Sequence, residues 1–211
     1  MRIAVYGCGG VGGYFGGRLA QIGQDVTFIA RNKNLQALRN RGLIVDSIAG
    51  DFHINKVQVS DNPAETGVVD YVLCCVKAWQ IPAAARAMKP LIGPDTLVIP
   101  LQNGVEAPQQ LATEIEPAQV LGGLCGIIVF QAGPGHIKHS GANPLIRFGH
   151  LDRHDRFVLF HSSQDKTFTV CCFRKQNSQV DKASFGNRRF RPVDNANVFL
   201  GQPLTIFKRS V

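Results

Sequence analysis

The chain has 211 residues, of which 45% are hydrophobic and 18% are charged, and its formal net charge is +8 at pH 7. This composition is that of a globular protein with one large domain, or with one domain and part of a second. No apolar run approaches the ~20 residues of a membrane span, and the glycine-rich first stretch does not fit a signal peptide. We therefore expect a cytoplasmic protein without a membrane partner.

The composition of the chain changes near residue 150. Residues 1–150 hold 12 Lys and Arg against 10 Asp and Glu, whereas residues 151–211 hold 11 against 5. The second part also carries 8 of the 13 phenylalanines and only 2 of the 22 glycines. We predict a boundary there, between a first domain over 1–150 and a basic, Phe-rich and poorly ordered tail over 151–211.

Apolar segments typical of strands alternate with segments typical of helices over the first 150 residues. The segment at 70–77 is apolar nearly throughout, as a strand covered on both faces is. Alternation of this kind produces a mostly parallel sheet with right-handed crossovers, so we predict an α/β fold, a Rossmann-type doubly wound sheet. In chain order the pattern predicts strand 2–6, helix 14–23, strand 25–31, helix 32–42, a hairpin-like excursion at 43–59, strand 70–77, helix 78–90, strand 96–102, helix 104–114, strand 120–131 and two short strands within 133–149.

Glycines crowd the segment between the first strand and the first helix, "YGCGGVGGYFGG". Gly7, Gly9 and Gly12 form a G-x-G-x-x-G pattern. In this pattern the first glycine permits a tight turn, the second admits a pyrophosphate, and the third lets helix and strand pack closely. The N–H groups of the helix N-terminus favour the negative pyrophosphate. We predict a dinucleotide site, with a merely tight turn as the alternative, made by Gly7, Cys8, Gly9, Gly10, Val11 and Gly12; the glycines at 13, 16 and 17 are expected to serve helix packing.

The end of the second predicted strand, "FIARNK", indicates which dinucleotide binds. Sites for NAD usually place an acidic residue there, on the ribose 2′-hydroxyl. This chain has Arg31 at that position, and a guanidinium suits the 2′-phosphate of NADP. We therefore predict NADP as the cofactor, with an ordinary exposed arginine as the alternative.

Two polar residues follow the next two predicted strands of the sheet. Lys77 ends "DYVLCCVK" and Asn103 ends "TLVIPLQN". Ligands of open α/β sheets bind outside the carboxyl ends of the strands, where an ammonium can hold an anion and an amide can bridge a ribose and a substrate oxygen. A solvated lysine and an Asn-Gly turn are the alternatives, but their joint placement beside the glycine loop favours a substrate pocket.

The segments "GCGGVGGYFGGRLA", "VKAWQ", "LQNGVE" and "GPGHIKHSG", in this order, resemble the ketopantoate reductases (2-dehydropantoate 2-reductases). The resemblance runs from Met1 to about His150. It implies NADPH-dependent reduction of ketopantoate to pantoate, on the route to pantothenate and coenzyme A. It also implies that the glycine loop, Arg31, Lys77 and Asn103 line the NADPH site, with Lys77 and Asn103 facing the pocket of the 2-keto acid.

The tail departs from the pattern of this family, whose members continue into a helical second domain. That domain supplies a general acid, a lysine with asparagine four residues later, and a downstream glutamate. Ketone reduction needs such an acid for the developing alkoxide. The tail lysines, at 166, 175, 182 and 208, have no asparagine at the fourth following position, and the tail has no glutamate. Segments 156–163, 166–175 and 197–211 are instead strand-like, so we predict an atypical short tail from a truncated or frame-shifted gene, or a genuine divergent one.

Three functions follow as hypotheses. The first is a reductase of the ketopantoate type, whose general acid stays unassigned, with Lys77 as a substitute proton donor. The second is a non-catalytic NADP-binding protein, because the family's acid is missing. The third and least favoured is a nucleic-acid partner, from "GNRRFRP" in the tail. No CxxC spacing occurs, and the histidines at 136, 139, 150 and 154 lack a fourth ligand, so we predict no metal site; oligomerisation is left open.

Overall fold

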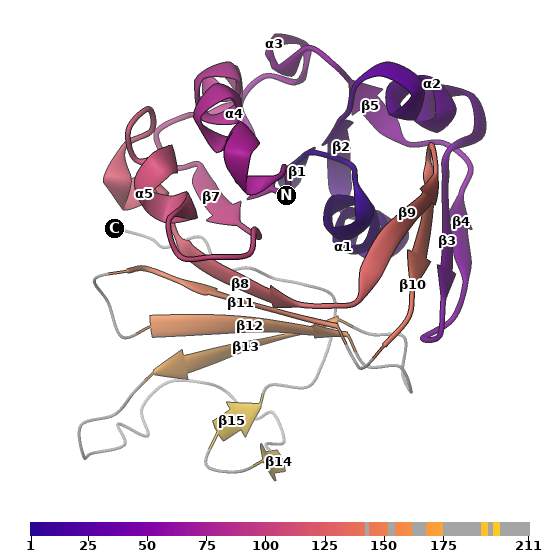
Figure 1. Ribbon diagram of the computed structural model, residues 1–211. Coiled ribbons are helices and arrows are strands. Elements are labelled where there is room, and N and C mark those ends of the chain that lie inside the picture. Colours follow the sequence, from indigo (N-terminus) through magenta and orange to yellow (C-terminus); the bar gives the residue numbers. More distant parts are fainter. Residues whose placement is uncertain (142–143, 152–154, 162–167, 175–190, 194–195, 199–211) are drawn as a thin grey trace.

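The computed structural model of the protein describes residues 1–141, 144–151, 155–161, 168–174, 191–193 and 196–198 (Figure 1). Side chains are described for residues 1–141 and 144–151. A parallel sheet with helices on both faces forms one part of the molecule. Two four-stranded sheets that contain antiparallel strand pairs lie beside it (Figure 1). Among the described residues, none of the helices has the length and apolar character needed to cross a membrane.

The central sheet has five strands that all run in parallel, in the order β5-β2-β1-β6-β7. The chain begins in the middle of the sheet, adds strands on one side and then crosses to the other side of β1. The α/β, Rossmann-type fold predicted from the alternation of strands and helices is therefore confirmed. The strands are β1 (Arg2–Tyr6), β2 (Asp25–Ile29), β5 (Gln58–Ser60), β6 (Tyr71–Cys74) and β7 (Leu97–Pro100).

Helices cover both faces of this sheet because its strands are apolar on both sides (Figure 1). Along β1, Ile3 and Val5 belong to the hydrophobic cluster on the side of α1, whereas Ala4 and Tyr6 belong to the cluster of α4 and α5. The predicted helix at 78–90 is divided into η1, α4 and η2, with Pro82 in the first turn of α4. The helices are α1 (Gly10–Gln21), α2 (Asn32–Arg41), α3 (Pro63–Thr66), α4 (Ile81–Ala87) and α5 (Ala107–Leu111), with the 3-10 turns η1 (Ala78–Gln80), η2 (Lys89–Leu91) and η3 (Pro117–Gln119).

A second sheet packs against α1, in the order β4-β3-β10-β9. The hairpin expected within 43–59 is confirmed for β3 (Leu43–Ser47) and β4 (Phe52–Ile54), which pair in antiparallel. It is wrong for the last residues of that range, because β5 leaves the hairpin and pairs in parallel with β2. The remaining strands of the second sheet are β9 (Val129–Gly133) and β10 (His136–His139).

The single strand predicted at 120–131 is wrong. Val120 makes one parallel bridge to Val98 of β7, and the chain then forms two strands that belong to different sheets, β8 (Gly122–Gly126) and β9. The chain still passes close to the end of β7, since a Cβ at Gly123 would overlap the carbonyl oxygen of Pro100. β8 instead pairs in antiparallel with β11 (Leu145–Gly149).

Strands also follow residue 150. β12 (Asp155–His161) pairs with β11 and with β13 (Phe168–Arg174), and a short ladder joins β14 (Arg191–Val193) to β15 (Ala196–Val198). Strands were expected at 156–163 and 166–175, and β12 and β13 confirm them. The expected strand at 197–211 lies outside the described residues except for its first two, as does most of the tail that we expected to be poorly ordered.

Candidate dinucleotide site

The glycine loop, residues 7–12, follows β1 and opens α1. Gly7 has a φ of 103°, in the left-handed region that favours glycine, and a Cβ there would lie 3.0 Å from the backbone nitrogen of Val76. A Cβ at Gly12 would overlap the carbonyl oxygen of Gly7. A Cβ at Gly9, in contrast, would meet no atom within 4 Å. Two glycines of the pattern thus fold the loop tightly, and the middle one leaves space above it.

The other members of the predicted set pack against the hydrophobic core and against β9. The Cys8 side chain is buried, and Val11 packs against the cluster around α1. A Cβ at Gly10 would lie 3.1 Å from the carbonyl oxygen of Val129, so β9 borders the loop. The packing role expected for the later glycines is confirmed, since Cβ atoms at 13, 16 and 17 would lie 2.6–2.7 Å from side-chain atoms of Ile137, Phe28 and Leu43.

The N-terminus of α1 is built to receive an anion. Gly9 is the N-cap, no side chain caps this end, and the first turn has no acidic residue. The first backbone bond of the helix runs from Gly13 N to Gly9 O at 2.8 Å. The N–H groups that precede it have no acceptors within the helix, so they and the helix dipole favour a phosphate group above Gly9.

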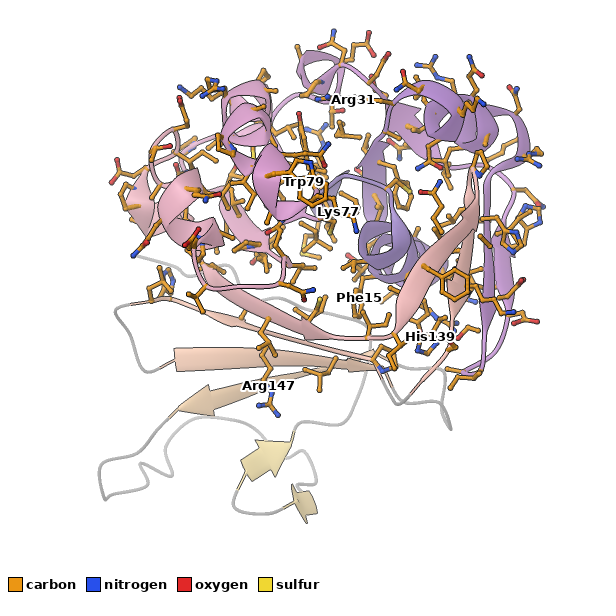
Figure 2. The ribbon with its side chains drawn as sticks, viewed as in Figure 1. Phe15, Arg31, Lys77, Trp79, His139 and Arg147 are labelled. Atoms are coloured by element: carbon orange, nitrogen blue, oxygen red, sulfur yellow. The ribbon has the colours of Figure 1, made fainter. Side chains whose placement is uncertain are left out.

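Arg31 lies where β2 gives way to α2, as its N-cap, and its side chain is exposed (Figure 2). The next residue, Asn32, has a φ of 52°, the one positive value among non-glycine residues of the described chain. Burial raises the pKa of Tyr6, at the end of β1, and the positive charge of Arg31 partly opposes that rise. Tyr6 pairs with Ile29 of β2, so Arg31, two residues further along the chain, is near the end of β1, on the side of the loop where β2 lies.

Lys77 and Asn103 lie on the other side of the loop, after β6 and β7. Both side chains are exposed, and Figure 2 shows Lys77 and Trp79 between α1 and α4. Gln102, which the sequence analysis did not identify, joins the segments that follow β6 and β7. Its Nε2 donates to the carbonyl oxygens of Cys74 at 2.8 Å and Val76 at 3.0 Å. The side chain thus extends the β6–β7 pairing past the last backbone bond.

Two of the remaining candidates, His136 and His139, have structural partners. His136 Nε2 lies 2.8 Å from Asp46 Oδ2, and His139 Nδ1 lies 2.8 Å from Ser47 Oγ. Within the part of the chain that the structure describes, no group of three or more His, Cys, Asp or Glu side chains could hold a metal ion. Among the cysteines whose side chains are described, four are free thiols, and burial raises the pKa of Cys8 to about 12. His154 lies outside the described residues.

The geometry defines a class of protein. The strand order reverses beside β1, between β2 on one side and β6 on the other, and open α/β sheets bind their ligands at such a point. The glycine loop lies at this point and presents the unpaired N–H groups of the start of α1. Arg31 lies on one side of the loop and Lys77 on the other. The chain therefore has the architecture of the doubly wound α/β proteins, whose ligands bind where the strand order reverses.

Comparison with known proteins gives the family. The family described as ketopantoate reductase PanE/ApbA matches residues 3–153. The uncharacterized oxidoreductase YkpB of Bacillus subtilis is 38% identical over 149 residues, which cover 71% of this chain and 48% of that protein. The 2-dehydropantoate 2-reductase of Mesorhizobium japonicum is 34% identical over 217 aligned residues, which cover 92% of this chain and 66% of that protein.

Solved structures agree. A 2-dehydropantoate 2-reductase from Porphyromonas gingivalis W83 matches with a TM-score of 0.67 and 36% identity, over 71% of this chain and 55% of that one. A D-mandelate dehydrogenase, solved with NADH and anilino(oxo)acetate, matches with a TM-score of 0.62 and 25% identity, over 67% of this chain and 46% of that one. The chain belongs to the ketopantoate reductase family of oxidoreductases. It spans about half the length of the first curated relatives, 48% and 43%.

Proposed function

We propose that this chain binds NADPH and reduces a small 2-keto acid, 2-dehydropantoate, to pantoate, a step of pantothenate and coenzyme A biosynthesis. The observation that carries the proposal is the open glycine loop at the N-terminus of α1, with cationic side chains at the strand ends on both flanks. The family membership and the reductases among the relatives support it. The cofactor-binding set is Gly7, Cys8, Gly9, Gly10, Val11, Gly12, Arg31, Lys77 and Asn103.

The residues present fit a dinucleotide. The space above Gly9 admits a pyrophosphate to the backbone, and a side chain there would fill it. Arg31 follows β2 with its guanidinium exposed, where it can hold a 2′-phosphate by bidentate bonds. The related D-mandelate dehydrogenase was solved with NADH, so the fold alone does not select the cofactor. Arg31 supports NADPH.

Lys77 and Asn103 are the proposed contacts of the 2-keto acid. The bound cofactor supplies a hydride to the carbonyl carbon of the substrate. The ammonium of Lys77 can bind the carboxylate or polarise the carbonyl oxygen, and the Asn103 amide can donate to the same oxygen. The developing alkoxide needs a proton, and Lys77 is the group of this site that can supply one. Gln102 fixes the relative position of Lys77 and Asn103, because it precedes Asn103 in the chain and bonds the carbonyl oxygen of Val76, the residue before Lys77.

A second candidate function is binding without turnover. It is favoured by residues 151–211, which contain no glutamate and no lysine followed by asparagine four residues later. We propose 1–150 as the NADP-binding domain and 151–211 as a separate basic tail. The Mesorhizobium alignment covers 92% of this chain, more than residues 1–150 make up, which favours a divergent tail over a frame-shifted one. Reading the coding DNA around codons 148–160 in all three frames tests that choice.

One preparation can separate the two functions. Trp79 is the sole tryptophan and 78% exposed, two residues after Lys77, so energy transfer from its indole to NADPH reports binding. Ketopantoate reduction is then assayed on the same sample. Turnover at the ordinary ~1–1,000 per second would establish the reductase. Binding with turnover at least ~100-fold lower, the usual contribution of a general acid, would support the non-catalytic function, and no binding would overturn both.

A further inference from the structure

The side chain of Asn34, in the first turn of α2, joins three segments around the glycine loop. Its Nδ2 donates to the carbonyl oxygen of Cys8. Its Oδ1 accepts from the backbone N–H of Gly135 at 2.7 Å and from Gln131 Nε2 at 3.1 Å. One half-buried amide therefore connects the loop and α2 to the turn between β9 and β10.

The bond to Cys8 determines how the next peptide group is oriented. The described chain contains no cis peptide bonds, and in a trans peptide the C=O and the following N–H point in opposite directions. Because Asn34 holds the Cys8 carbonyl, the N–H of Gly9 faces away from α2. That N–H donates to no other described residue, and the space beside Gly9 is open. Asn34 thereby turns a free donor toward the region above the loop.

The Oδ1 atom of Asn34 connects the glycine loop to the β9–β10 hairpin. Gly135 and Gln131 belong to the β9–β10 hairpin, whose Val129 carbonyl borders Gly10. Without the Asn34 oxygen, the N–H of Gly135 would lose its partner. The amide thus holds the loop between α2 and β9, and nothing in the local sequence around residue 8 indicates this contact, which is 26 residues away.

We propose that Asn34 is a positioning residue for the dinucleotide, which presents the Gly9 N–H to the pyrophosphate by holding the Cys8 carbonyl. The proposal rests on the proposed function, since it needs a dinucleotide at the loop. Asn34 and Arg31 affect different parts of the ligand, the pyrophosphate and the 2′-phosphate. The pyrophosphate is common to NADPH and NADH, whereas the 2′-phosphate belongs to NADPH alone.

The experiment compares the affinities of two Asn34 variants for both cofactors, measured by Trp79 energy transfer. Asn34→Leu removes the amide at similar volume. Asn34→Asp keeps an oxygen for Gly135 and Gln131 but has no donor for the Cys8 carbonyl. The same two substitutions at Asn40, exposed on α2, control for apolar and charge changes on that helix.

We expect both Asn34 variants to weaken NADPH and NADH by one common factor, about three- to tenfold for a lost hydrogen bond, with the ratio of the two affinities unchanged. The Asn40 variants should bind as the wild type does. If the wild type binds neither cofactor, the proposed function itself fails. If the wild type binds and both Asn34 variants bind equally well, only the role of Asn34 is overturned.

Two further outcomes also decide the proposal. A loss confined to NADPH would overturn it, because Asn34 would then act through Arg31. Asn34→Leu can disturb the β9–β10 turn, and Asn34→Asp, which keeps the acceptor, then decides. Loss of cooperative melting in both variants would overturn the proposal, because the amide would then hold the fold and not the loop.

Discussion

Two glycine substitutions separate packing from ligand contact in the glycine loop. A Cβ at Gly12 would overlap the carbonyl oxygen of Gly7 and lie 2.9 Å from Val5 Cγ1 and 3.0 Å from Cys75 Cβ. That carbonyl belongs to the backbone, so the loop or the helix has to shift. A Cβ at Gly9 meets no atom within 4 Å, and the Gly9 φ of −87° is accessible to any residue.

The expected magnitudes follow from these contacts. Overpacking of this kind costs ~1–3 kcal/mol, and alanine in place of a helical glycine returns about 0.5–1 kcal/mol. The overlapped atom belongs to the backbone, so the cost lies toward the upper end of that range, and Gly12→Ala should lower the free energy of unfolding by about 1–2.5 kcal/mol. For a chain of this size this lowers the melting temperature by ~2–10 °C. Gly9→Val changes only an N-cap, at less than about 1 kcal/mol, but places a branched side chain where the pyrophosphate has to lie.

Circular dichroism melts and NADPH titration by Trp79 energy transfer measure both effects. Gly9→Val should melt within a few degrees of the wild type, by the same size scaling, and should no longer bind NADPH. Gly12→Ala should melt earlier. Wild-type affinity in Gly9→Val would show that the glycines serve packing alone. A wild-type melting temperature in Gly12→Ala would refute the close contact between Gly7 and α1.

Three other results are expected. Arg31→Ala should remove most of a preference for NADPH over NADH, which is about ten- to hundredfold for a charge-assisted contact. The control Lys33→Ala, at an exposed position in α2, should keep that preference. Equal affinities of the wild type for the two cofactors would contradict the assignment to NADPH. Gln102→Ala leaves the Val76 carbonyl without its donor, while the Cys74 carbonyl keeps the N–H of Leu101. It should lower the free energy of unfolding by about 1–3 kcal/mol, whereas the exposed Gln109→Ala should change it by less than ~0.5 kcal/mol. Equal urea midpoints would refute the role of Gln102 in joining the ends of β6 and β7. Burial raises the pKa of Cys8 from 9.0 to about 12, so at pH 8 the folded protein should react with iodoacetamide at Cys8 far more slowly than the urea-unfolded chain. Between about pH 9 and 12 the unfolded chain ionises this thiol while the folded protein keeps it protonated, so the stability of the fold decreases over that range. Equal rates of alkylation would show that the thiol is not buried.

The sequence by itself determined the first unit of the fold, and it also predicts the chemistry of that unit. Strand 2–6, the glycine pattern and the following helix are adjacent in the chain, so their spacing alone predicts a turn that approaches a pyrophosphate. The positions of Arg31, Lys77 and Asn103 at one edge of the sheet could be predicted as well, because each follows an apolar strand, and parallel strands end at one edge. The apolar character of β1 on both faces already required helices on both sides.

Only the tertiary structure decided where the remaining strands pair. The apolar run at 120–131 is typical of one strand, yet its first part pairs with β11 and its second part with β10, so the run is divided between two sheets. The roles of Gln102 and Asn34 were equally hidden, because each amide bonds a carbonyl 26 or 28 residues away in the chain. Such contacts depend on which segments the packed sheet brings together, and no local pattern of residues records them.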